Sequence, residues 1–268
     1  MAVLSLKGGV GKTSLVLGLA GAALMRNIRT LVVDLDPQGN CTATLDPDPT
    51  KCTVADVLAD PRCSVLRDAI APSAWGVNLD VLVGGEQTEG QNRPDPSRTG
   101  LRRLDRALSQ LDTITDNPPY RLVLLDCPPS LGQLTRSALV AADRALLVTE
   151  PTIYAVAGVQ RAFEAVQAER EHNPDLQPLG VVINRVRRWS SEHQFRINEL
   201  REIFGPLVLP TVLPDRSAVQ QAQGAALPIQ RWATPGAREV AVAIDLLLAR
   251  MLRTSQLRRR THADLPQA

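Results

Sequence analysis

Cysteines, lysines and aromatic residues are few in this 268-residue sequence, and long apolar runs are absent. The cysteines form no Cys-x-x-Cys pair and lie at long, unequal spacings, which favours reduced thiols over a zinc site or a disulfide framework; they are Cys41, Cys52, Cys63 and Cys127. No apolar run reaches the roughly 18 to 20 residues that cross a bilayer, and no basic, apolar leader follows Met1. The sequence therefore predicts a cytoplasmic protein without a membrane span.

The scarcity of lysine is informative because of where the lysines lie. The net charge of +2, from 30 basic and 28 acidic residues, indicates neither an acidic nor a basic partner. Lysine occurs only at Lys7, Lys12 and Lys51, and every other basic residue is an arginine. Two of the three lysines lie five residues apart in one glycine-rich stretch. That stretch requires an ammonium group on a flexible stem, which arginine does not supply.

Apolar runs alternate with helical stretches along most of the chain. Strands are predicted at Ala2–Leu6, Thr30–Asp34, Val77–Val83, Leu122–Asp126, Ala145–Thr149, Leu179–Asn184 and Leu207–Leu213. Helices are predicted at Lys12–Met25, Leu101–Leu111, Leu131–Ala141, Ala155–Glu171, Ser191–Phe204 and about Ala237–Arg253. Most strands lack polar alternation, as expected for strands covered on both faces. The predicted fold is α/β, a doubly wound, mostly parallel sheet with helices on both faces.

The chain is predicted to form a single domain over residues 1–257, followed by a polar, disordered tail at 258–268. Gly84–Gly100 is rich in Gly, Pro, Asp and Gln. Because the rhythm of strands and helices resumes after it, this segment is predicted to be a long exposed loop rather than a domain boundary.

A phosphate-binding loop is predicted between the first strand and the first helix. The residues are Lys7, Gly8, Gly9, Val10, Gly11, Lys12, Thr13 and Ser14. Glycines let backbone N–H groups approach an anion, and the start of a helix adds its dipole. Lys12 can reach the β- and γ-phosphates, and the Thr13 hydroxyl can bind Mg²⁺. The sequence therefore predicts a fold of the P-loop NTPase type, although Lys7 replaces the first glycine of the common loop.

The loop resembles the deviant Walker A motif of the ParA/MinD ATPases, most closely the ParA (Soj-type) partition ATPases. Three further segments match the family in order along nearly the whole chain. Leu31–Asn40 is similar to the first switch region, and Leu122–Ser130 to the second switch with its Walker B strand. Val181–Asn184 is similar to the strand end that meets adenine.

The resemblance implies catalytic roles for Lys7, Lys12 and Asp36. In the family the first lysine, here Lys7, reaches the phosphates of the partner subunit in an ATP-sandwich homodimer, while Lys12 acts within its own subunit. Asp36 is the family's candidate for orienting the attacking water, a role that fits the electrostatic nature of phosphoryl transfer. The alternative for Asp36 is a cap on the turn before Pro37. Asp34, two residues earlier, is predicted to support the loop.

Magnesium is expected at Thr13 and Asp126. Asp126 is the last residue of an apolar strand, where an unpaired carboxylate would be costly. We therefore expect it to contact Mg²⁺ through a water molecule. The alternative is a simple Asx turn at the end of the strand. ATP and Mg²⁺ are therefore the predicted cofactors.

Adenine is the base that the sequence favours. Guanine-reading loops of the Asn-Lys-x-Asp kind end in aspartate, whereas Asn184 is followed three residues later by Arg187. By resemblance, Asn184 contacts adenine, and Pro214 and Asp215 form the segment that packs on the base. Many family members carry a carboxylate where Arg187 stands.

DNA contacts are expected at arginines that follow the last two predicted strands, Leu179–Asn184 and Leu207–Leu213. ParA-type dimers bind DNA without sequence preference through basic residues, and the candidates here are Arg185, Arg187, Arg188 and Arg216. Where relatives often have an arginine, this chain has Trp189 beside Arg188. The alternative is that these arginines form an ordinary solvated surface, since arginine is the default cation of the chain.

The resemblance implies an ATPase that forms an ATP-bound homodimer on nucleoid DNA and hydrolyses ATP slowly until a partner stimulates it. The partner would be a ParB-like protein or a cargo adaptor, and the cargo a chromosome, a plasmid or a protein complex. One alternative is a MinD-like, membrane-associated positioning ATPase, but the C-terminal stretch Thr254–Arg260 offers one apolar residue among its arginines, which argues against a membrane helix. Another is a metabolic ATP-dependent ligase of the dethiobiotin synthetase type.

Overall fold

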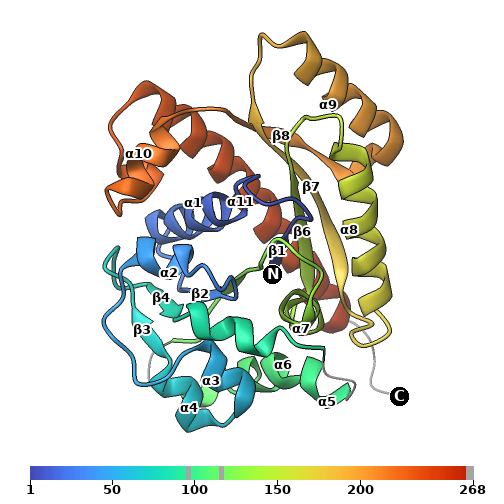
Figure 1. Ribbon diagram of the computed structural model, residues 1–268. Helices are drawn as coiled ribbons and strands as arrows, with labels where there is room; N and C mark the ends of the chain where they lie inside the picture. Colours follow the sequence, from blue (N-terminus) through green and yellow to red (C-terminus); the bar gives the residue numbers. More distant parts are fainter. Residues whose placement is uncertain (95–97, 115–117, 264–268) are drawn as a thin grey trace.

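A single mixed sheet organises the computed structural model, which describes residues 1–94, 98–114 and 118–263. Among these residues eight strands pair in the order β3-β4-β2-β5-β1-β6-β7-β8. All neighbouring strands are parallel except β3, which pairs with β4 in the antiparallel direction at one edge. The predicted α/β, doubly wound, mostly parallel sheet is confirmed (Figure 1).

The strands are β1 (Ala2–Leu4), β2 (Thr30–Asp34), β3 (Ile70–Pro72), β4 (Leu79–Leu82), β5 (Leu122–Asp126), β6 (Arg144–Thr149), β7 (Gln177–Val186) and β8 (Val208–Pro214). The α-helices are α1 (Lys12–Met25), α2 (Asn40–Leu45), α3 (Val54–Ala59), α4 (Cys63–Asp68), α5 (Arg98–Leu101), α6 (Arg103–Leu108), α7 (Gln133–Ala141), α8 (Ala155–Glu169), α9 (Ser191–Phe204), α10 (Ala218–Gly224) and α11 (Pro235–Ala263). Short 3₁₀ helices are η1 (Glu86–Gln91), η2 (Leu111–Thr113), η3 (Gly205–Leu207) and η4 (Ile229–Arg231).

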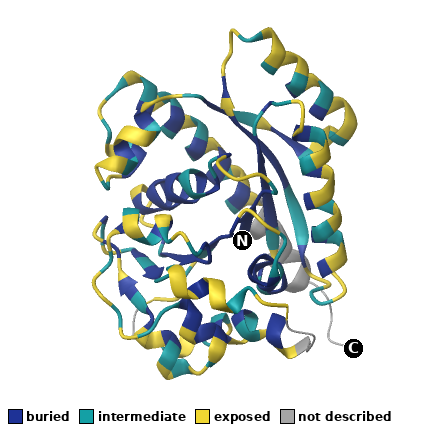
Figure 2. Cartoon of the chain, in the orientation of Figure 1, coloured by how far each residue is buried: buried dark blue, intermediate teal, exposed yellow. Residues whose placement is uncertain are grey.

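Two apolar cores, one on each face of the sheet, hold the helices in place. Successive side chains of a strand point to opposite faces, so Ala2 and Leu4 enter one core and Val3 enters the other. The first core packs the strands against α3, α4, α6, α7, α8 and α9. The second packs them against α1, α2, α10 and α11. Strands β1 and β2 are buried throughout, while the outer faces of most helices are exposed (Figure 2).

Several elements coincide with their predicted bounds, among them α1, α9, β2 and β5. The short elements β3, α2, α3, α4 and α10 were not predicted, because runs of three to seven residues carry too little periodicity to be recognised. Helix α11 continues to Ala263 rather than ending near Arg253. Residues 264–268 lie outside the described residues, and the disorder expected for 258–268 stays a prediction.

The segment after β4 is more closely packed than the predicted exposed loop. A Cβ at Gly84 would strike the backbone of Asp34, so the chain approaches the end of β2 closely. The Gly84 N–H donates to the Thr42 hydroxyl at 3.0 Å, and Thr88 is buried. Further along, Asn92 accepts from the Leu134 N–H at 3.4 Å. This segment therefore contacts the first predicted switch region at Asp34, and the start of α7 after the second; residues 95–97 lie outside the described residues.

No helix among the described residues is both long enough and apolar enough to span a bilayer.

Candidate functional site

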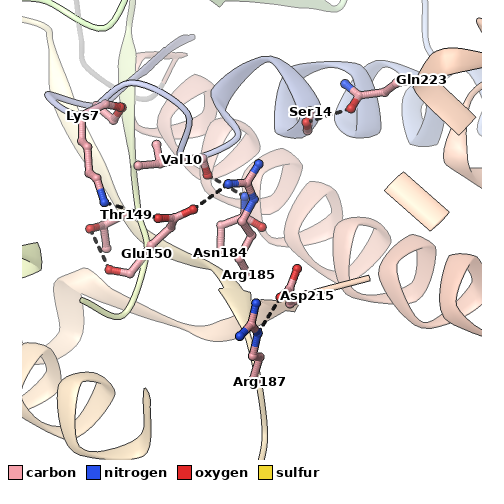
Figure 3. A network of polar contacts seen from close by, with 11 residues as sticks. Lys7, Val10, Ser14, Thr149, Glu150, Asn184, Arg185, Arg187, Asp215 and Gln223 are labelled. Carbon is pink, nitrogen blue, oxygen red and sulfur yellow. Dashed lines mark hydrogen bonds and ion pairs between the residues drawn. The ribbon is translucent and has the colours of Figure 1, made fainter. Parts of the chain in front are cut away.

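The phosphate loop lies at the carboxyl edge of the central strands, between β1 and α1. Gly9 and Gly11 adopt the left-handed backbone conformation, with φ of 77° and 90°, and Gly11 directly precedes the first helical residue. A Cβ at Gly11 would strike the side-chain amide of Asn184, so glycine is required there for space as well as for φ. The Asn184 amide donates to the Val10 carbonyl at 2.7 Å, which fixes the loop against β7 (Figure 3).

The two loop lysines have opposite environments. Lys12, the first residue of α1, is 6% exposed and lies in the field of the Asp126 carboxylate. The side chain of Lys7 is 56% exposed, and its Nζ lies 3.6 Å from Glu150 Oε2 at the end of β6. Figure 3 shows Lys7 extended toward Thr149 and Glu150. One ammonium is thus fixed inside the site, and the other is held at its rim.

A magnesium site fits the side chains at the end of β5. The Thr13 hydroxyl donates to Asp126 Oδ2 at 2.7 Å, while Asp126 Oδ1 is buried without a hydrogen-bond partner. Among the described residues no group of three or more His, Cys, Asp and Glu side chains could hold a metal alone. Magnesium suits such a place, since it keeps several waters and binds one or two carboxylates plus substrate phosphates. Thr13 and Asp126 would hold it, as the sequence predicted.

Burial raises the pKa of two carboxyl groups beside this site. Desolvation is the main cause for Asp126, whose pKa rises to about 8, and the nearby Asp34 raises it further. The pKa of Asp34 rises to about 6, again mainly through desolvation, although the Thr42 N–H opposes the shift. Ionising either carboxyl group in the folded chain therefore costs free energy, and a bound cation would remove that cost.

These pKa shifts predict that the ligand-free protein becomes less stable as the pH rises from about 4 to about 8. In that window Asp126 keeps its proton in the folded state and loses it in the unfolded state, so unfolding releases protons and higher pH favours unfolding. We expect the melting temperature to fall by several degrees between pH 5 and pH 8. Thermal melts of Asp126→Asn, which cannot ionise, should show a clearly smaller fall; an equal fall in the variant would contradict the prediction.

The first switch is ordered around Asp34. Its carboxylate accepts from the Thr42 N–H at 2.7 Å and from the Asp36 N–H at 3.3 Å, which supports the loop as predicted. Asp36 is 9% exposed, and its Oδ1 accepts from the Gln38 N–H at 3.0 Å. The carboxylate of Asp36 thus caps the turn, which was the alternative reading. That hydrogen bond engages one of its two oxygens, so orientation of a water by Asp36 stays a prediction.

A cavity of about 420 Å³ opens beside the phosphate loop and gathers the predicted adenine residues. Asn184, Pro214 and Asp215 line it together with Ser14. Its deeper wall is apolar and comes from α1, α10 and α11, including Leu17, Val219 and Ile244. A cavity with one apolar wall and polar groups around the rest of its lining suits a planar base that carries hydrogen-bonding groups.

Two contacts at this cavity were not foreseen from the sequence. The Ser14 hydroxyl donates to Gln223 Oε1 at 3.1 Å, which ties α10 to the start of α1 across the cavity. Arg187 Nε donates to Asp215 Oδ2 at 2.8 Å, so a predicted DNA residue pairs with a predicted adenine residue (Figure 3).

All four predicted DNA arginines form ion pairs with carboxylates. Arg185 pairs with Glu150 at 2.8 Å, the same carboxylate that holds Lys7. Arg188 and Arg216 share Glu239 of α11, at 3.5 Å and 2.6 Å. The structure thus brings Arg188 and Arg216 together, and it gives each arginine a local counter-charge.

Sequence patterns could have identified one of these carboxylates. Glu150 directly follows a buried strand, at the edge of the sheet where functional groups gather. Its position in the sequence could therefore have indicated a candidate site residue. Glu239 and Gln223 lie within helices far from any motif, and only the folded chain places them beside Arg216 and Ser14.

Comparisons with known proteins show which chains this one is similar to. A family model described as an AAA domain (AAA_31) matches residues 1–178. The chain is 32% identical over 236 residues to the chromosome partitioning protein ParA of Caulobacter vibrioides (strain NA1000 / CB15N), covering 85% of each protein. It is 32% identical over 251 residues to the sporulation initiation inhibitor protein Soj of Bacillus subtilis (strain 168), covering 92% of this chain and 95% of that protein.

A solved structure shares the whole fold. Cobyrinic acid a,c-diamide synthase from Mycobacterium smegmatis, with a bound ATP analogue and magnesium, superimposes with a TM-score of 0.76 at 25% identity. The match covers 95% of this chain and 94% of the synthase chain.

Proposed function

The chain belongs to the ParA/MinD family of ATPases, and we propose that it works as a partition-type switch on DNA. Its cofactors are ATP and Mg²⁺. In the proposal, ATP closes a dimer of two copies in the cytoplasm, and the dimer binds nucleoid DNA without sequence preference. A ParB-like protein or a cargo adaptor then accelerates hydrolysis, and the dimer separates. The cargo is a chromosome, a plasmid or a protein complex.

The opposite placement of the two loop lysines carries this proposal. Lys12 is buried within its own phosphate site, whereas Lys7 extends to the rim and is more than half exposed. A loop lysine that is exposed at the rim and paired with Glu150 suits a contact with the phosphates of a second chain. ATP then acts as the link between subunits, because its charge is shared between Lys12 of one copy and Lys7 of the other.

Hydrolysis follows from groups already in position. The glycine loop and the start of α1 present N–H groups to the phosphates, and Lys12 adds a fixed positive charge. Asp36 lies near the end of β2, where its free oxygen would orient the attacking water. Thr13 and Asp126 would hold Mg²⁺, which when bound neutralises charge on the phosphates.

Glu150 links the phosphate loop to the DNA-facing side of the proposed switch. It contacts Lys7 through Oε2 and Arg185 through Oε1 in the single chain. When Lys7 crosses to a partner copy, Glu150 keeps only Arg185 as its cation. Dimer formation would therefore rearrange charge at the start of the loop between β7 and α9.

The proposed DNA contact is the arginine surface, defined as Arg185, Arg187, Arg188 and Arg216. Each arginine pairs with a carboxylate, but the arginine side chains remain from 39% to 72% exposed. Exposed ion pairs are worth only about 0 to 1 kcal/mol, so the phosphates of a duplex can compete for these arginines. Binding through phosphates is insensitive to sequence and weakens as salt increases.

Fluorescence anisotropy with a labelled duplex of unrelated sequence tests this function. We expect tight, salt-sensitive binding with ATP and Mg²⁺, and weak binding with ADP. Equal DNA binding with both nucleotides would contradict a switch controlled by ATP. Absence of DNA binding with ATP would contradict the proposed role of DNA.

Charge variants of the arginine surface should act in opposite directions. Arg188→Ala and Arg216→Ala should each weaken duplex binding and flatten the log–log salt dependence by about two units at most, since each dimer loses two phosphate contacts of roughly 0.9 each. Glu239→Gln should strengthen binding, by up to roughly tenfold, because it releases both arginines from their shared carboxylate.

Glu202→Gln provides the matched control for Glu239→Gln. It makes the same change in net charge at an exposed position near the far end of α9. Anisotropy titrations across a range of salt concentrations compare the two. Equal strengthening by both variants would mean that net charge, rather than the shared carboxylate, controls affinity.

An ATP-dependent ligase is the second candidate, because the synthase shares the fold at a TM-score of 0.76. Such an enzyme needs a second substrate in order to consume ATP. DNA-stimulated or partner-stimulated ATP hydrolysis without any small-molecule acceptor favours the partition switch over the ligase.

A further inference from the structure

Trp189 is the most exposed large apolar side chain among the described residues. It is 99% exposed, whereas Trp75 is 4% exposed and Trp232 is partly buried. It occupies the short turn between β7 and α9, beside Arg187 and Arg188 of the arginine surface. An indole left wholly in water forgoes the burial that usually stabilises a tryptophan, so its position calls for a contact outside the chain.

The turn that presents Trp189 is firmly held on both sides. The Arg187 N–H donates to His193 Nδ1 at 3.0 Å, and the Ser190 N–H donates to the Arg187 carbonyl at 3.1 Å. The Gln194 amide donates to the Arg188 carbonyl at 3.3 Å, and Ser190 caps α9 by accepting from the His193 N–H. The backbone is thus fixed while the indole projects freely, which keeps the entropy cost of a contact low.

The surroundings of the indole favour a polyanion over a bilayer or an apolar protein surface. The neighbouring side chains of Arg187 and Arg188 are 72% and 70% exposed. The first turn of α9 is polar and carries the exposed carboxylate of Glu192. Phe195, in the following turn, is 59% exposed, but the guanidinium of Arg196 lies over its ring, 5.0 Å from the ring centre. A membrane contact needs an apolar face, and a protein hot spot needs an apolar or well-packed rim around the aromatic residue.

We propose that Trp189 stacks on DNA bases and gives the ATP-bound dimer a preference for DNA with unpaired bases. The proposal rests on the proposed DNA binding and names the DNA form that this surface recognises. In duplex DNA the faces of the bases are already covered by their neighbours, whereas single strands leave them free. Aromatic stacking on free bases is insensitive to sequence, as the proposed function requires, and the adjacent arginines bind the phosphates.

Stacking and phosphate contacts differ in their dependence on salt. Trp189→Ala should weaken binding to a single-stranded oligo(dT) by roughly tenfold or more, with the slope of the salt dependence unchanged. It should weaken duplex binding much less. Arg188→Ala should instead flatten the slope for both DNA forms, and Trp189→Phe should retain most of the affinity for oligo(dT).

The intrinsic fluorescence of Trp189 provides a direct readout in the full-length chain with ATP and Mg²⁺. The difference in emission between the wild-type chain and Trp189→Ala isolates this indole from Trp75 and Trp232. Titration with oligo(dT) should quench the difference signal more strongly than titration with duplex DNA. Anionic phosphatidylglycerol vesicles and neutral phosphatidylcholine vesicles should leave it unchanged.

Three results would overturn the proposal. If Trp189→Ala binds oligo(dT) as tightly as the wild-type chain, stacking is absent although DNA binding by the arginines stands. If anionic vesicles shift the Trp189 emission to the blue and neutral vesicles do not, Trp189 contacts a lipid surface. If the wild-type chain binds neither DNA form with ATP, the proposed DNA function fails together with this inference.

Discussion

Replacing Lys12 by alanine is expected to abolish ATP binding, whereas replacing Lys7 should leave binding by the single chain largely intact. Lys12 is buried at the start of α1, where its ammonium balances the phosphates and the Asp126 carboxylate. A charged hydrogen bond is worth about 1.5–3 kcal/mol, so the loss of one to each of the β- and γ-phosphates should weaken ATP binding by roughly a hundredfold or more. Lys7 lies at the rim beside Glu150, so its loss should prevent ATP-dependent dimers instead.

Calorimetry measures the affinity of each variant for ATP, and light scattering measures the mass of the particle that it forms in the presence of ATP. Lys51→Ala is the control, since Lys51 is the remaining lysine and is exposed far from the phosphate loop in sequence. It should match the wild-type chain in both experiments. Normal dimers of Lys7→Ala with ATP would show that Lys7 has no role across the subunits.

Replacing Asp36 by alanine should lower the rate of ATP hydrolysis by about a hundredfold or more while ATP binding and dimer formation persist. Loss of a group that orients or activates water typically has an effect of about this size. The ATP-bound dimer should then accumulate and stay on DNA. Loss of ATP binding in this variant would make Asp36 a structural residue.

Asparagine at the same position separates the two roles of Asp36. Asp36→Asn keeps a side-chain oxygen that can accept from the Gln38 N–H and so preserves the turn. If Asp36 only caps the turn, this variant should hydrolyse ATP at the wild-type rate. If the carboxylate orients water, it should be slow, like Asp36→Ala. Asp48→Ala, which removes an exposed carboxylate from the following loop, serves as the control.

Local sequence was sufficient to predict the phosphate loop and its helix. The glycines fix the backbone conformation, Lys12 begins α1, and an apolar run makes a long buried helix, so each of these features depends on neighbouring residues. Thr13 was predicted from its place after Lys12 in the phosphate loop, and Asp126 from the cost of an unpaired carboxylate at the end of an apolar strand. The structure brings the two side chains into contact at 2.7 Å, and the binding of Mg²⁺ there stays a prediction.

The partners of the charged residues were beyond prediction from sequence. Arg188 and Arg216 are exposed residues with many possible counter-charges, and only the docking of α11 on the sheet brings Glu239 to both. Glu150 holds Lys7 and Arg185 because β6 lies between β1 and β7, an order that the sequence alone does not specify. The close packing of Gly84 on Asp34 likewise depends on the pairing of β4 with β2.

The mass of the chain in solution with ATP tests the proposed switch most directly. Light scattering on Asp36→Ala with ATP and Mg²⁺ should give a particle of two chains of 29.0 kDa each, and the same protein with ADP should give a single chain. A single chain with ATP bound, or dimers of equal strength with ADP, would contradict the account.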